Sequence, residues 1–335
     1  MASAATSSDA DIFERVQRFV RAQPGHELAR VEGLRRVATG RSRENWLFDV
    51  IDGAADGATK APLIARRDPL GGLLDTDRAT EFAVLQALES TAVPAPKARW
   101  LDPHGEAFGR PCLVMVREPG DCDYFALSSS EPLPARSDLA RRLCELLATV
   151  HAVDWQAVGL GAAFSDPGPN AAEHEVDHWE QILRNDQLEA WPELDLASGW
   201  LRANAPRSAK TVLVHGDFKV GNVLLVDGQI VALLDWELAH LGDPHEDLGW
   251  VTQPLRTREH YIPGTWERAE LLAHYEQATG MTVDHEAVAW WNVLASYKTA
   301  VMQVSGLRSF VEGRSDELYQ PSATVLDRLL QAVTG

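Results

Sequence analysis

Apolar residues follow two different periods along the chain, and the period changes after about a third of its length. In the first third, alternating or short continuous apolar runs predict strands, and apolar residues three to four positions apart predict helices. The predicted strands are Leu34–Val37, Trp46–Ile51, Leu63–Arg66, Ala98–Leu101 and Cys112–Val116, and the predicted helices are 11–22 and 76–90. Either Thr76 or Asp77 is a candidate cap for the second helix.

The rest of the chain is predicted to be mostly helical from about Ser137 onward. One interruption contains two apolar runs, Val223–Val226 and Ile230–Leu234, which are joined by Asp-Gly and therefore predict a β-hairpin. The turn-rich segment EPGDCDY stands where the period changes. A length of 335 residues also suggests two domains. We therefore predict an N-terminal lobe over 1–117 and a C-terminal lobe over 118–335.

Composition narrows the class of protein. A hydrophobic share of 45% and a charged share of 24% are ordinary for a globular chain. The formal charge of −18 argues against general binding to nucleic acid or to anionic membranes. The three cysteines form no CxxC pair, and the chain shows neither a secretory signal nor a long apolar run. We therefore expect a cytoplasmic protein without nucleic-acid or membrane partners; the oligomeric state stays open.

The segment His215–Asn222, HGDFKVGN, carries the clearest chemistry. Asp217 precedes the predicted hairpin, and Asp235 follows it, thirteen residues after Asn222. Because a hairpin returns the chain to its starting point, the two carboxylates and the amide can converge. Such oxygen ligands suit Mg²⁺, and one carboxylate could stay free of metal to accept a proton from a hydroxyl group. Those are the parts that phosphoryl transfer requires.

HGDFKVGN followed by LLDWE resembles the catalytic and metal-binding segments of the aminoglycoside phosphotransferase-like kinases. The resemblance implies an α+β, two-lobe fold like that of protein kinases, with an N-terminal antiparallel sheet and a mostly helical C-terminal lobe. It implies that Asp217 is the catalytic base and that Lys219 lies beside the transferred phosphoryl group. It also implies that Asn222 and Asp235 are the Mg²⁺ ligands. A solvated surface lysine is the alternative for Lys219.

The segment GDPHEDLGW resembles the stretch in which an aspartate of this family braces the catalytic loop, and that role falls on Asp247. Asp243 is a candidate cap of the same helix. Three histidines receive ordinary interpretations. We expect His151 to be a satisfied core or helix-end residue, and we expect His240 and His245 to lack the company of other metal ligands.

Two further segments resemble the nucleotide-binding parts of such kinases. TGRSRENWLFDV is similar to the loop that covers the phosphates, which places Gly40 and Ser42 beside them. Leu113–Arg117, followed by Glu-Pro-Gly, is similar to the hinge that receives the adenine, which places Met115 and Arg117 at the nucleotide.

Arg66 stands where kinases of this type carry a phosphate-binding lysine. A guanidinium stays charged and can hold a phosphate and a carboxylate at once. By the same resemblance its partner is Glu81. Glu81 shares a helical face with Leu85 and Leu88, so its carboxylate points toward packing and needs a nearby cation.

RRDPLGGLLDTDRATEFAVLQAL and LLDWELAHLGDPHEDLGW most resemble a subgroup related to the kinase-like domain fused to some acyl-CoA dehydrogenases. That domain is associated with phosphorylating hydroxyacyl-CoA thioesters. The resemblance predicts an ATP- and Mg²⁺-dependent phosphotransferase that acts on a hydroxyl group of a small molecule. A hydroxyacyl-CoA is the first choice of acceptor and an aminoglycoside the second. A nucleotide-binding pseudokinase is the non-enzymatic alternative.

The C-terminal segment supports the choice of acceptor. It contains few acidic residues, whereas a polycationic antibiotic needs them. Trp290, Trp291 and Tyr297 lie on apolar helical sequence, which suits an uncharged or acyl substrate. Arg308 and Arg314 are candidate cations for the phosphates of a CoA ester.

Overall fold

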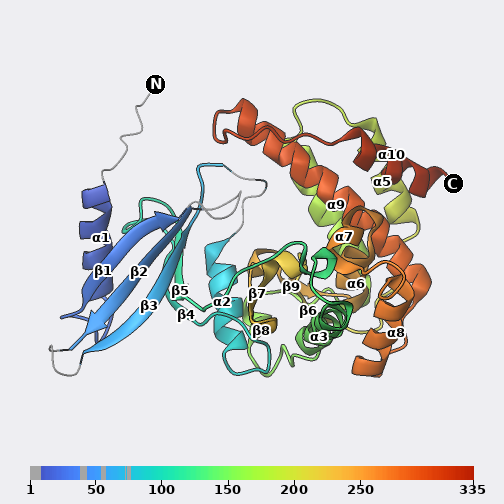
Figure 1. Cartoon of the computed structure of the whole chain (residues 1–335). Helices are drawn as coiled ribbons and strands as arrows, with labels where there is room; N and C mark the ends of the chain where they lie inside the picture. The colour runs from blue at the N-terminus through green and yellow to red at the C-terminus, as the bar shows by residue number, and fades with distance from the viewer. Residues whose placement is uncertain (1–8, 38–43, 54–57, 72, 74–76) are drawn as a thin grey trace. The chain divides into compact units, whose positions relative to one another are not determined.

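A computed structural model describes residues 9–37, 44–53, 58–71, 73 and 77–335. The chain forms two compact units (Figure 1). The first contains the described residues up to Leu70 together with Asp77–Phe82 and Pro96–Glu118. The second contains Gly71, Leu73, Ala83–Ala95 and Pro119–Gly335.

A five-stranded antiparallel sheet forms most of the first unit, and its strand order is β1-β2-β3-β5-β4. The strands are β1 (Arg30–Val37), β2 (Glu44–Asp52), β3 (Thr59–Arg67), β4 (Ala98–Asp102) and β5 (Cys112–Val116). Helix α1 (Asp9–Arg21) lies against the sheet (Figure 1). Trp46, Phe48 and Val50 alternate along β2 and are buried beneath this helix, as the period of a strand dictates. The predicted antiparallel N-terminal sheet is confirmed.

Helix α2 (Arg78–Leu88) is two residues shorter at each end than predicted. Asp77 precedes it, and its carboxylate accepts a 2.9 Å hydrogen bond from the N–H of Ala79, so this candidate cap is confirmed. Thr76, the other candidate, lies outside the described residues.

Helices dominate the second unit, as the resemblance implied. They are α3 (Leu133–His151), α4 (Ala171–Asp186), α5 (Pro192–Ala203), α6 (Pro244–Thr252), α7 (Thr257–His260), α8 (Arg268–Thr279), α9 (His285–Val311) and α10 (Ala323–Thr334). Helix α9 contacts α4, α5, α6 and α10 and forms the centre of the packing (Figure 1). Among the described residues, no helix combines the length and the apolar character that crossing a bilayer would demand.

The predicted hairpin is present as β7 (Val223–Val226) and β8 (Gln229–Leu233). Asp227 and Gly228 both have positive φ, of 49° and 71°, which matches the tight turn that Asp-Gly favours. A second pair of short strands, β6 (Val212–Val214) and β9 (His240–Gly242), flanks the segments that lead into and out of this region.

Trp290, Trp291 and Tyr297 are buried in the core around α9. Their apolar surroundings reflect packing, because a helix covered on several sides is hydrophobic around most of its circumference. Packing therefore explains the apolar sequence around these three residues, and this sequence gives no support to an uncharged or acyl acceptor.

Candidate active site

The loop between β6 and β7 brings three of the predicted residues together. Lys219 Nζ lies 2.6 Å from Asp217 Oδ2. The amide nitrogen of Asn222 donates to the same carboxylate oxygen at 3.1 Å and to the backbone carbonyl of Asp217 at 3.0 Å. Lys219 is therefore a partner of Asp217 and not a solvated surface lysine. Although burial disfavours the cation, Asp217 and the nearby Tyr124 together raise the pKa of Lys219 above its usual range.

His215 holds the two ends of this region together. Its Nδ1 accepts from the N–H of Asp217 at 3.2 Å, and its Nε2 donates to the carbonyl of Leu234 at 2.9 Å. These contacts assign the proton to Nε2 in a neutral ring. Burial lowers the pKa of His215, which agrees with the neutral form. Asp235 follows Leu234 directly, so the ring links the segments of both predicted carboxylates.

Asp235 ends the hairpin in a left-handed conformation, with φ of 61°. The preceding Leu234 donates its N–H to the carbonyl of Asn222 at 2.7 Å. This bond brings the backbone of Asp235 beside that of Asn222, as the hairpin argument predicted.

The donor set around the loop fits a hard divalent cation. Asn222 directs its NH₂ group at Asp217, which leaves the amide oxygen as its ligand atom. Asp235, whose backbone lies beside that of Asn222, could offer carboxylate oxygens, and Mg²⁺ needs only a few such protein ligands because water and phosphates complete its shell.

Asp247 fixes the backbone of the loop from the first turn of α6. Its carboxylate accepts from the N–H groups of His215 and Gly216 at 2.8 and 2.9 Å, and from His151 Nε2 at 3.0 Å. Although burial opposes its ionisation, these donors hold the pKa of Asp247 at about 2. Asp243 caps α6 by accepting the N–H of His245. The brace and the cap are both confirmed.

His151 is buried and satisfied, as predicted. Its Nδ1 lies 2.6 Å from the hydroxyl of Tyr275, and its Nε2 contacts Asp247.

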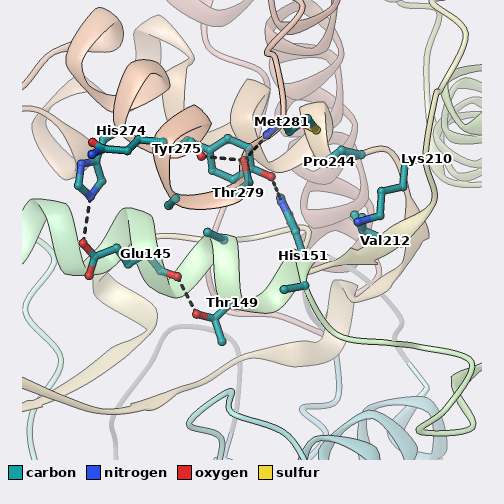
Figure 2. A pocket seen from close by; sticks show the side chains of 14 residues that line it. Glu145, Thr149, His151, Lys210, Val212, Pro244, His274, Tyr275, Thr279 and Met281 are labelled. Atoms are coloured by element: carbon teal, nitrogen blue, oxygen red, sulfur yellow. Dashed lines mark hydrogen bonds and ion pairs between the residues drawn. The ribbon is translucent and has the colours of Figure 1, made fainter.

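The rings of His151 and Tyr275 also form part of the lining of a pocket of about 650 Å³ in the second unit (Figure 2). The residues that line this pocket do not include any of the predicted catalytic or metal-binding residues.

In the first unit, Arg66 pairs with Glu81 as predicted. Arg66 Nη1 lies 3.0 Å from Glu81 Oε1, and the Glu81 side chain is 0% exposed. A second cation, Arg78, contacts the other oxygen of the same carboxylate. The sequence reasoning missed Arg78, although its position three residues before Glu81 on a helix was a usable signal.

The other predicted nucleotide residues lie on β5 or outside the described part of the chain. Met115 is buried within β5. Arg117 follows this strand; its side chain donates to Asp49 at 2.8 Å and its N–H donates to the carbonyl of Pro62. Gly40 and Ser42 lie outside the described residues.

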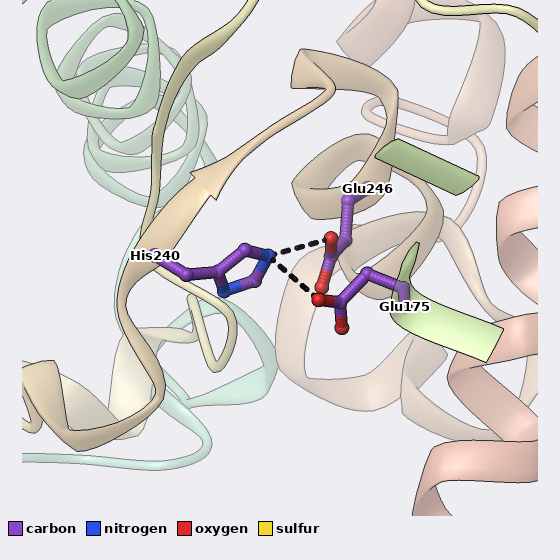
Figure 3. Close-up of side chains that lie close together, drawn as sticks. All are labelled: Glu175, His240 and Glu246. Atoms are coloured by element: carbon purple, nitrogen blue, oxygen red, sulfur yellow. Dashed lines mark hydrogen bonds and ion pairs between the residues drawn. The ribbon is translucent and has the colours of Figure 1, made fainter. Parts of the chain in front are cut away.

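The expectation that His240 lacks the company of metal ligands is wrong. Its Nε2 lies 3.0 Å from Glu246 and 3.5 Å from Glu175, and the three groups form a compact cluster (Figure 3). Glu175 is distant in sequence, so spacing could not reveal it, whereas Glu246 lies only six residues after His240 and was overlooked. The ring also donates from Nδ1 to the carbonyl of Leu238, which leaves both nitrogens facing acceptors. Despite burial, the glutamates raise the pKa of His240 to about 10.

Sequence reasoning also missed two side chains near the loop. Lys219 Nζ lies 5.6 Å from the centre of the Tyr124 ring, and a Cβ on Gly221 would lie 2.6 Å from the same ring. His260, in α7, is buried, and burial together with Arg256 lowers its pKa to about 3, while Asp217 acts in the opposite direction. Tyr124 ends the turn-rich segment EPGDCDY, which was interpreted only as the point where the period changes, and His260 lies in no motif named from the sequence.

Comparisons with known proteins agree with this geometry. The model of the phosphotransferase enzyme family matches residues 33–291. The chain belongs to this family. Among curated proteins, it is 31% identical to mouse acyl-CoA dehydrogenase family member 10 over 193 residues, which cover 56% of this chain and 18% of that protein. It is 28% identical to rat acyl-CoA dehydrogenase family member 11 over 234 residues, which cover 68% and 29%. The chain therefore spans less than a third of the length of either relative.

Solved structures show the same fold. A Ralstonia eutropha JMP134 protein assigned as an aminoglycoside phosphotransferase matches with a TM-score of 0.68 and 22% identity, over 97% of this chain and 96% of that one. The streptomycin–ATP complex of APH(2'')-IIa matches with a TM-score of 0.58 and 14% identity, over 89% and 90%. Macrolide 2'-phosphotransferase MphH from Brachybacterium faecium matches with a TM-score of 0.52 and 19% identity, over 90% and 92%. The fold is kinase-like.

Proposed function

We propose that this chain is an ATP- and Mg²⁺-dependent phosphotransferase that acts on a hydroxyl group of a small molecule, with Asp217 as its catalytic base. The observation that supports this most directly is the Asp217 carboxylate, held by Lys219 and Asn222 on a loop whose backbone Asp247 braces. A structurally similar protein, APH(2'')-IIa, was solved with ATP.

Asp217 orients the acceptor hydroxyl and takes its proton. As the acceptor oxygen forms its bond to the γ-phosphorus, the bond from that phosphorus to the bridging oxygen breaks and ADP leaves. Lys219 lies beside the base, and its positive charge stabilises the negative charge of the transferred phosphoryl group. Mg²⁺, held by Asn222 and Asp235, would neutralise charge on the nucleotide phosphates.

The first unit supplies the proposed nucleotide contacts. Arg66, fixed by Glu81, binds phosphate, and Gly40 and Ser42 of the preceding loop do the same through backbone and hydroxyl groups. Met115 and Arg117 belong to the segment proposed to receive the adenine.

The proposed acceptor is a hydroxyacyl thioester, and the support comes from the relatives. Two of these relatives are named acyl-CoA dehydrogenase family members, and this protein matches only part of each of them. Arg308 and Arg314 support a CoA ester less than the sequence suggested, because both form ion pairs with Glu312 and their charges are already partly neutralised. An aminoglycoside is the second candidate, since some structural neighbours are named aminoglycoside phosphotransferases. The pseudokinase alternative predicts loss of a key side chain, whereas Asp217, Asn222 and Asp235 are all present.

The test is ATP consumption by the purified chain with hydroxyacyl-CoAs, aminoglycosides, choline and sugars, followed by the variant Asp217→Asn on the best acceptor. We expect turnover to fall by about 10²–10⁴ while ATP still binds, because only proton transfer is lost. Asp227→Asn, in the turn of the neighbouring hairpin, makes the same chemical change and should stay active. An Asp217→Asn protein with wild-type turnover would exclude Asp217 as the base. Efficient phosphorylation of aminoglycosides with none of any hydroxyacyl-CoA would overturn the choice of acceptor alone.

A further inference from the structure

Lys298 is a buried cation that reaches the loop carrying Asp217. It lies in α9, and its side chain is 3% exposed. Its Nζ donates a 2.6 Å hydrogen bond to the carbonyl oxygen of Gly216, which is 82 residues away in sequence and directly precedes Asp217.

The surroundings of Lys298 stabilise its charge away from water. Its Nζ lies 5.2 Å from the ring centre of Trp179 and 5.0 Å from that of Trp250, distances at which an indole face attracts a cation. Glu246 Oε1 lies 3.7 Å away, and through Glu246 the lysine joins the cluster with His240 and Glu175. Apolar residues of similar volume often serve stability equally well or better than buried ions. Core packing alone therefore does not explain a buried lysine at this position.

The peptide group between Gly216 and Asp217 is held at both ends. Its carbonyl accepts from Lys298, and its N–H donates to His215 Nδ1. Gly216 itself has φ of 78°, and a Cβ there would lie 2.5 Å from the carbonyl oxygen of Leu238. Since a side chain cannot restrict this flexible position, the hydrogen bonds must set the orientation of the peptide.

We propose that Lys298 is a positioning residue: its ammonium group sets the orientation of the Gly216–Asp217 peptide and thereby aims the Asp217 carboxylate. This inference rests on the proposed function of Asp217 as catalytic base. Lys298 acts through the backbone. Asp247 of α6 accepts a hydrogen bond from the N–H of Gly216, and Lys298 of α9 donates one to the carbonyl of the same residue.

The first experiment compares kcat and KM of Lys298→Met, Lys298→Arg and Val301→Ala. Methionine keeps the volume but loses the donor, and a base displaced by a fraction of an ångström to one ångström costs about 10–100-fold in kcat. KM for ATP and acceptor should change by less than about threefold, since the Lys298 side chain is buried and acts through a backbone carbonyl. Arginine should restore part of the loss. Val301, fully buried in the same helix, provides a variant that loses stability without losing the contact.

The second experiment measures hydrogen exchange of the Gly216 and Asp217 amides in the same full-length proteins. We expect faster exchange in Lys298→Met and no such change in Val301→Ala. Equal exchange in both variants, or a parallel loss of kcat in both, would overturn the proposal. If the wild-type protein phosphorylates no acceptor, the proposed function fails, while the exchange data still decide whether Lys298 orients the peptide.

Discussion

At the residue scale, the candidate site depends on two carboxylates, each of which accepts hydrogen bonds from two or three donors. Asp217 shares its carboxylate between Lys219 and Asn222, and Asp247 serves three donors at once. Each contact has a defined donor and acceptor, so removing one partner has a predictable consequence.

The metal ligands give the first residue-scale prediction. Asn222→Ala and Asp235→Ala should each weaken Mg²⁺-dependent ATP binding, because each removes an oxygen from the donor set. Titration calorimetry with Mg·ATP measures this directly, and Asp227→Ala in the hairpin turn serves as the control. Unchanged affinity and unchanged metal requirement in both variants would contradict the assignment.

Glu81 gives the second prediction at the residue scale. Its carboxylate lies between Arg66 and Arg78, so Glu81→Ala leaves buried guanidinium groups without their shared anion. We expect the free energy of unfolding to fall by about 3–5 kcal/mol, with the lower end favoured by the 11% exposure of Arg66. Denaturant unfolding is the measurement. Glu89→Ala, an exposed change just beyond α2, should alter stability by less than about 0.5 kcal/mol.

At the scale of elements, the close approach of α6 to α9 determines where the brace and the positioning lysine can lie. A Cβ on Gly249 of α6 would lie 2.4 Å from Trp291 Cβ and 2.7 Å from its carbonyl carbon. The two helices therefore contact each other through backbone and core atoms that cannot move aside cheaply.

A matched pair of glycines tests this contact. Gly249→Ala should lower the free energy of unfolding by about 1–3 kcal/mol through overpacking. Gly199→Ala, in α5, meets no atom within 4 Å and should raise stability by about 0.5–1 kcal/mol, because alanine is the better helix former. A Gly249→Ala protein at least as stable as the wild type in thermal or denaturant unfolding would show that α6 and α9 tolerate separation.

At the scale of the whole molecule, buried histidines should shape the dependence of stability on pH. His240 has its pKa raised to about 10 because Glu175 and Glu246 outweigh the effect of burial, whereas an unfolded histidine titrates near 6.5. The folded state then binds more protons between these values, so stability from His240 is full below pH 6.5 and declines as the pH rises toward 10.

His240→Gln should therefore flatten the alkaline fall in stability between pH 6.5 and 10, besides lowering stability at neutral pH. Unfolding midpoints measured across this range for wild type and variant check the prediction. His104→Gln, an exposed substitution, is the control. If stability of the variant and of the wild type depended on pH in parallel over the whole range, the glutamates would not keep His240 protonated.

Local sequence determined much of this protein. The alternation of apolar residues determined the strands of the first unit, since each strand must bury one face, and Asp-Gly determined the turn of the hairpin. The spacing of Asp217, Asn222 and Asp235 around that hairpin determined their convergence. These features are local, because they depend on residues at most about twenty positions apart.

The tertiary structure alone decided which distant charges meet. Lys298 reaches Gly216 across 82 residues, His151 reaches Asp247 across 96, and Glu175 joins His240 only because α4 packs near β9. In a helix that is apolar on most sides, the pattern of hydrophobic residues does not reveal which way a single lysine points. The partner of Lys298 is a backbone carbonyl, which no residue type in the sequence identifies. Helix packing selects these partners, and packing is a property of the whole chain.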